Sequence, residues 1–137
     1  MKYQVADTPD AVAILIEQVE NDLMDAEVPF AAVNAAALCI EEHVVNILKH
    51  GKTEHKKPDI EIEVQLRDDR MIIDISDDTP PFDPTAADIP DHINAPIEER
   101  PIGGLGIHLV RTLTDEQRYE RTSEHNQLRL VKRLTDT

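Results

Sequence analysis

The stretch DDTPPFDPTAADIPDHINAPIEERPIGGLGIHLV occupies residues 77–110, and the rest of the chain is interpreted from it. A hydrophobic strand ends at Asp77, a proline-rich segment follows over residues 79–102, and a glycine cluster at 103–106 opens a helix. Irregular segments this long are uncommon in compact domains and usually form lids or binding loops. Glycines at a helix start let backbone N–H groups approach an anion, which the helix dipole also favours. The stretch therefore predicts a phosphate-binding loop under a lid, and a nucleotide is the first ligand to test.

Composition predicts one domain, residues 1–137, with an acidic surface. Lys and Arg number 14 against 28 Asp and Glu, which gives a net charge of −14. Such a surface repels nucleic-acid backbones and anionic membranes, so neither is expected as a partner. Cys39 is the only cysteine, which fits a reducing compartment. With no apolar signal core and no run of eighteen apolar residues, the chain is expected to be soluble and cytoplasmic.

Hydrophobic periodicity predicts the elements in the order β-α-α-β-β-lid-α-β-β. A strand at 2–6 precedes an amphipathic helix that Thr8 caps and that runs to about residue 26, and a second helix covers 29–50. Strict alternation marks a strand at 60–66, and the turn Asp68-Asp69-Arg70 leads into a second strand at 71–76, so a hairpin is the simplest pairing. A lid at 79–102, a helix at 104–114 and strands near 117–123 and 127–134 complete an α+β two-layer sandwich, with helices on one face of the sheet.

Three polar side chains on the second helix could take part in chemistry. Glu42, Asn46 and His50 are spaced four apart and share one face beside the apolar stripe. A carboxylate can act as a general base, and an amide oxygen can ligate Mg²⁺ together with phosphates and water. An ordinary solvated helix face remains the alternative at this point.

The long stretch offers a base-binding group and an anion-binding group. Asp77 can accept a hydrogen bond from an exocyclic amine of the kind adenine presents, although aspartate also forms turns. Gly103, Gly104 and Gly106 can approach phosphates, or they can serve only as a hinge. Arg100 can reach a phosphate or be a plain surface arginine. The scattered histidines lack zinc-ligand spacing, and neither Ser76, Ser123 nor Cys39 has a recognisable activating base.

Taken together, Glu-x-x-x-Asn, Asp before Pro-Phe-Asp-Pro, and Gly-Gly-Leu-Gly-Ile resemble the bacterial anti-sigma-factor serine/threonine kinases. These belong to the histidine-kinase-like ATPase superfamily shared with gyrase, Hsp90 and MutL. The resemblance covers nearly the whole chain and implies a mixed β-sheet, ATP and Mg²⁺ as cofactors, and transfer of phosphate to a serine or threonine. It implies an anti-anti-sigma (STAS-type) protein as phosphoacceptor, a sigma factor as a second candidate partner, and a homodimer as the usual state of that branch.

The resemblance also assigns roles to residues. Glu42 would be the catalytic carboxylate, Asn46 the Mg²⁺ ligand, and Arg100 an aid to the developing charge. The nucleotide would be held by a larger set: Asn46, His50, Asp77, Thr79, Phe82, Gly103, Gly104, Leu105 and Gly106.

The chain departs from the family pattern in two places. Thr79 stands where the family often has glycine, and the usual late threonine is not evident around Gln127 and Leu128. These departures favour the alternative function, a non-catalytic or nucleotide-free module that sequesters a partner in a bacterial partner-switching system.

Overall fold

The structure is a computed structural model that describes residues 1–6, 8–50, 57–85 and 110–134. Its elements within those ranges are β1 (Lys2–Gln4), α1 (Ala11–Asp25), α2 (Phe30–His50), β2 (Ile60–Arg67), β3 (Arg70–Asp77), β4 (Glu116–Arg121) and β5 (Asn126–Arg133). A short helical segment at 110–113 precedes β4. The expected helix at 104–114 and lid at 79–102 are therefore described only over residues 110–114 and 79–85.

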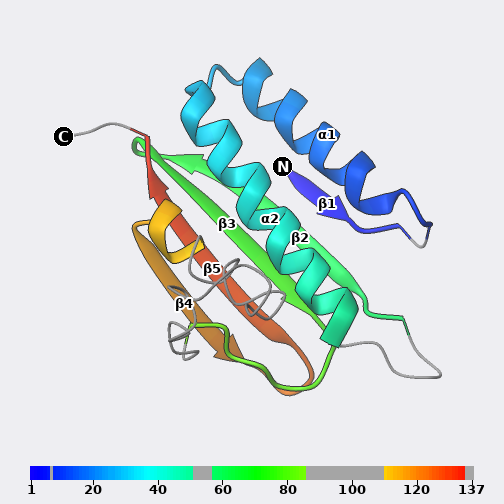
Figure 1. Ribbon diagram of the computed structural model, residues 1–137. Coiled ribbons are helices and arrows are strands. Elements are labelled where there is room, and N and C mark those ends of the chain that lie inside the picture. The colour runs from blue at the N-terminus through cyan, green and yellow to red at the C-terminus, as the bar shows by residue number, and fades with distance from the viewer. Residues whose placement is uncertain (7, 51–56, 86–109, 135–137) are drawn as a thin grey trace, which may run out of the picture.

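The described strands form one sheet in the order β1-β2-β3-β5-β4, and α1 and α2 lie together on one of its faces (Figure 1). This confirms the α+β two-layer fold. The expected mixed sheet is wrong for these strands, because all four pairings are antiparallel. Two consecutive helices between β1 and β2 bring the chain back to the end of the sheet where β1 stops, so β2 runs antiparallel to β1. The strands β2 and β3, and likewise β4 and β5, are joined by short turns, which makes each pair antiparallel.

The first helix follows its apolar spacing but starts later than predicted. Leu15, Val19 and Leu23 are buried on the stripe that faces α2 and the sheet. Thr8 is not the N-cap: the backbone N–H of Ala11 donates to Thr8 O at 3.1 Å, which closes a turn, and Asp10 takes the cap position. The proline after Thr8 therefore lies in that turn and not in the first turn of the helix.

The second helix is the central element of the core. Val33, Ile40 and Val44 are buried against the sheet. The window Phe30–Lys49 is long and apolar enough to cross a membrane by length and composition, with a mean hydropathy of 1.3. Half of that window is buried inside the fold, as is usual for the core helix of a globular domain.

The β2–β3 hairpin sets the register that brings the site residues together. Its two-residue turn, Asp68-Asp69, has φ values of 51° and 62°, as a type I′ hairpin turn requires. The ladder begins at Arg67↔Arg70 and runs to Ile60↔Asp77. Alternate residues are buried along β2, as the alternation at 60–66 predicted, and also along β3. β3 then pairs with β5 from Arg70↔Arg133 to Asp77↔Asn126.

Candidate functional site

A cavity of about 310 Å³ lies between the C-terminal half of α2 and the end of the sheet where β3 stops. Its apolar wall includes Ile47 from α2, Ile75 from β3 and Leu128 from β5. The segment after β3, residues 79–84, supplies the opposite side. Small-molecule sites have this size and this mainly apolar lining with a few convergent polar groups.

Asp77 is the buried carboxylate of this cavity, and its two oxygens differ. Oδ1 accepts hydrogen bonds from the Thr79 backbone N–H at 3.0 Å, the Thr79 hydroxyl, and Asn126 Nδ2 at 3.0 Å. Within the described residues, Oδ2 accepts no hydrogen bond. The sequence left a turn role and a ligand role open for Asp77. The structure shows the turn role on Oδ1, and the ligand role stays a prediction for Oδ2.

Asn126 is the residue that sequence reasoning missed. The strands predicted near 117–123 and 127–134 left it outside both, but it is buried at the first position of β5, directly opposite Asp77. Its Nδ2 also lies within hydrogen-bond distance of Thr79 O at 3.2 Å and Pro80 O at 3.0 Å. Its Oδ1 accepts from the Tyr119 hydroxyl at 2.6 Å and from the Phe82 backbone N–H at 3.3 Å. One side chain thus ties β3, β4 and the segment 79–82 together.

Thr79 fits its position without the backbone freedom of glycine. It is buried, and it is not among the described non-glycine residues with positive φ. Its carbonyl also accepts a hydrogen bond from Arg121 Nη1 at 2.7 Å. The departure from the usual glycine is therefore accommodated, because the threonine hydroxyl bonds Asp77.

Two aromatic rings line the cavity. The sequence has two Phe and two Tyr, and one of each, Phe82 and Tyr119, borders this space. Phe82 is 53% exposed, so its ring is accessible to a ligand in the cavity. A planar base would give this ring a stacking partner.

Of the predicted pair on α2, Asn46 borders the cavity and Glu42 is hydrogen-bonded to Asn46. Asn46 Nδ2 donates to Glu42 Oε1 at 3.2 Å, and Asn46 lines the cavity. This bond turns Asn46 Oδ1 away from the carboxylate and leaves it as an acceptor, the ligand type that Mg²⁺ prefers. Among the described residues no group of three or more His, Cys, Asp or Glu could hold a metal. A cation here would therefore depend on Asn46 together with ligand oxygens and water.

His43 forms part of the inner wall and was not predicted to be there. It is buried, and its Nε2 has no hydrogen-bond partner among the described residues. Burial lowers the pKa of His43 to about 4, so the imidazole is neutral near pH 7. Its place one helical turn from Ile40 and Ile47 is the signal that could have located it.

Cys39 was not expected to be a nucleophile, and the predicted positions not yet discussed lie outside the described side chains. Burial raises the pKa of the Cys39 thiol to about 11, so a thiolate nucleophile is disfavoured. His50 ends α2, but its side chain is outside the described part of the chain. The remaining predicted residues also lie outside it: Arg100, Gly103, Gly104, Leu105 and Gly106.

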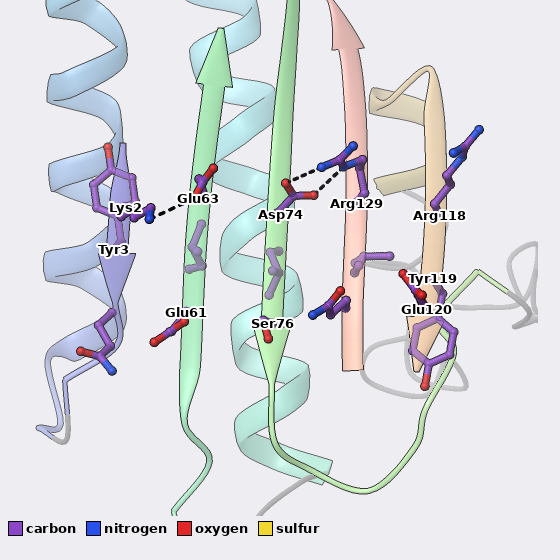
Figure 2. Close-up of a pocket in the computed structure, with 15 residues that line it drawn as sticks. Lys2, Tyr3, Glu61, Glu63, Asp74, Ser76, Arg118, Tyr119, Glu120 and Arg129 are labelled. Carbon is purple, nitrogen blue, oxygen red and sulfur yellow. Dashed lines mark hydrogen bonds and ion pairs between the residues drawn. The ribbon is translucent and has the colours of Figure 1, made fainter. Parts of the chain in front are cut away.

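A larger hollow of about 1050 Å³ lies over the helix-free face of the sheet (Figure 2). It contains none of the predicted site residues. Its charges pair across strands, with Arg129 Nε and Nη2 donating to Asp74 at 2.7 and 3.0 Å, and Lys2 Nζ 3.7 Å from Glu63. A polar, self-paired face of this kind is typical of an antiparallel sheet with one side in water.

The family described as histidine kinase-like ATPase domain matches residues 5–132 of the 137. The chain belongs to this family. Membership in the histidine kinase-like ATPase domain family implies ATP binding, and the cavity beside Asp77 has the size and the polar group that a base needs. No curated protein matches the chain.

Solved structures with the same fold include the RsbU and RsbW domains of Rv1364c from Mycobacterium tuberculosis, with a TM-score of 0.68 at 15% identity. That match covers 98% of this chain and 31% of the other. The histidine kinase domain of the Erythrobacter litoralis blue-light activated kinase EL346 has a TM-score of 0.54 at 14% identity. That match covers 90% of this chain and 61% of the other. The Acinetobacter baumannii histidine kinase AdeS has a TM-score of 0.53 at 11% identity. That match covers 99% of this chain and 68% of the other. At these identities the likeness shows the fold alone, and this chain spans less than two thirds of the first two proteins.

Proposed function

We propose that this chain is a cytoplasmic Mg·ATP-dependent protein kinase of the anti-sigma type, which phosphorylates a serine or threonine of a STAS-type partner. The observation that carries the proposal is the asymmetry of Asp77. Oδ1 is held by three protein donors, while Oδ2 is left as an acceptor in an apolar cavity of about 310 Å³. An exocyclic amine on a flat ring complements that arrangement.

The α2 pair supplies the second half of the proposed site. Asn46 Oδ1 would bind the Mg²⁺ that accompanies the phosphates, and Glu42 would accept the proton of the attacking hydroxyl. Bound Mg·ATP supplies the phosphoryl group, and such transfer depends mainly on positioning and charge stabilisation. The glycine segment 103–106 would hold the phosphates and Arg100 would offset developing charge, both as the family resemblance implies.

The partner is the least constrained part of the proposal. The resemblance to anti-sigma kinases supports a STAS-type phosphoacceptor, with a sigma factor as a second partner and a homodimer as the working unit. The RsbW domain in one structural neighbour is consistent with this branch. The two sequence departures that favoured a partner-sequestering module carry less weight now, because Thr79 has no positive φ and Asn126 supplies a polar group on the late strand.

A phosphotransfer assay tests the proposal. The protein is incubated with γ-labelled Mg·ATP and a STAS protein encoded nearby, beside Glu42→Gln and the matched control Glu41→Gln, whose residue is exposed one position away. Label should appear on the STAS protein with the wild type and Glu41→Gln and be lost with Glu42→Gln. Nucleotide binding without transfer to the STAS protein would overturn the kinase proposal and leave the ATP site standing.

A further inference from the structure

The hydrogen bonds of Asn126 leave its amide only one orientation. The Phe82 backbone N–H can only donate, so the atom it meets at 3.3 Å must be Oδ1. The carbonyls of Thr79 and Pro80 can only accept, so the atom facing them must be Nδ2. The Tyr119 hydroxyl donates to Oδ1 at 2.6 Å and strengthens the same orientation.

This orientation determines what Asp77 can do. Asn126 Nδ2 points at Asp77 Oδ1, which the Thr79 N–H also approaches at 3.0 Å. The Thr79 hydroxyl donates to the same oxygen. These donors occupy Oδ1 and fix the orientation of the Asp77 side chain. Asp77 Oδ2 then presents an acceptor to the cavity, and a base with an oxygen at the same place would meet it acceptor to acceptor.

We propose that Asn126, held in orientation by Tyr119, is a positioning residue that makes the cavity select a purine with an amine at position 6 over one with an oxygen there. The inference rests on the proposed nucleotide site and deepens it. Tyr119 lies on β4 near the end of the sheet (Figure 2) and Asn126 on β5, so the selection depends on the β4–β5 hairpin as well as on Asp77.

Replacing Asn126 should weaken the selection more than it weakens binding as such. In Asn126→Leu the Asp77 carboxylate loses the donor on β5 that holds Oδ1, so Oδ2 is no longer fixed as the oxygen that meets the base. Tyr119→Phe keeps the ring in the cavity wall and removes only the hydroxyl, so its effect should have the same direction and be smaller.

The test is direct titration of the full chain with Mg·ATP and with Mg·ITP, which differ in the amine or oxygen at position 6 and in the hydrogen that N1 carries in ITP. We expect the wild type to prefer ATP by roughly tenfold to a hundredfold, the range for a hydrogen bond to a charged group. Tyr119→Phe should lower the ratio of the ITP and ATP dissociation constants about threefold. In Asn126→Leu the two dissociation constants should differ by no more than about threefold. Tyr3→Phe is the matched control, because its hydroxyl bonds Asp22, away from this cavity, and its preference should equal that of the wild type.

The alternative outcomes separate the two proposals. If the folded Asn126 and Tyr119 variants lose ATP and ITP affinity by equal factors, Asn126 has only a structural role and this inference is overturned while the nucleotide site stands. If the wild type binds neither nucleotide, the proposed function fails and the inference fails with it. Should Asn126→Leu not fold, the Tyr119→Phe ratio alone decides.

Discussion

Asp77 and Asn126 face each other at the last pair of the β3–β5 ladder, and Asn126 Nδ2 donates to Asp77 Oδ1 at 3.0 Å. The two residues are 49 positions apart in the chain. Their pairing places the carboxylate at the end of the sheet, with Oδ1 held by protein donors. The proposed reading of the base depends on this contact.

Asn46 should couple nucleotide binding to magnesium. We expect Asn46→Ala to weaken ATP binding about tenfold or more in Mg²⁺ and to remove the difference between titrations with Mg²⁺ and with EDTA, because the amide oxygen beside Glu42 is lost. Asn34→Ala, an exposed amide on the same helix, is the control. A variant that keeps the full magnesium effect would show that another group binds the ion.

His43 should make the fold sensitive to mild acid. Its folded pKa is lowered to about 4 from 6.5, so between these values the unfolded chain binds a proton that the fold does not. The contribution of His43 to the free energy of unfolding is therefore fully present above pH 6.5 and falls as the pH drops. The loss is about 2 kcal/mol at pH 5 and about 3 kcal/mol below pH 4.

Urea unfolding of the wild type and His43→Leu at pH 7.5 and pH 5 checks this. At pH 7.5 the free energy of unfolding of the leucine variant should be close to that of the wild type, because the unpaired Nε2 is removed with the ring. On going to pH 5 the variant should lose about 2 kcal/mol less of this free energy than the wild type does. Equal losses in both proteins would mean that carboxyl groups alone cause the acid sensitivity.

The Asp68-Asp69 turn should tolerate glycine. Both residues have positive φ, which is unfavourable for a residue with a side chain, so Asp69→Gly should raise the unfolding free energy by up to about 1 kcal/mol. Asp69→Val should lower it, because a β-branched residue resists this conformation. Urea unfolding measures both, and a destabilised glycine variant would contradict the type I′ assignment.

The ion pair on the helix-free face should contribute little. Arg129 and Asp74 are joined by two hydrogen bonds, but half of the Arg129 side chain is exposed. A double-mutant cycle with Asp74→Asn and Arg129→Gln should give a coupling energy below about 1 kcal/mol that shrinks in high salt. ATP affinity should be unchanged, which a calorimetric titration verifies.

Much of the fold could be predicted because its signals are local. The period of Leu15, Val19 and Leu23 indicates α1, and the alternation along 60–66 indicates β2. Asp77 and Asn46 were predicted as site residues, and the structure places both at one cavity. The roles assigned to Arg100 and to the glycines at 103–106 stay predictions, since these residues lie outside the described ranges.

The contributions of Asn126 and Tyr119 could not be predicted in the same way. Asn126 lies next to a polar turn and has no local pattern of its own, and only the β3–β5 register brings it to Asp77. Tyr119 reaches the cavity through the hairpin pairing of β4 with β5. The mixed sheet was expected from the resemblance and is wrong for the described strands, which pair antiparallel. The direction of each strand follows from the helices and hairpins that connect it to its neighbours.

The most direct test of the account is a calorimetric titration of Mg·ATP into the wild type, Asp77→Asn and Asp74→Asn. Asp77→Asn places an N–H₂ donor where the base amine needs an acceptor, so its affinity should fall at least about tenfold, while Asp74→Asn on the same strand should match the wild type. Equal ATP affinity in the wild type and a folded Asp77→Asn would contradict the claim that Asp77 reads the base.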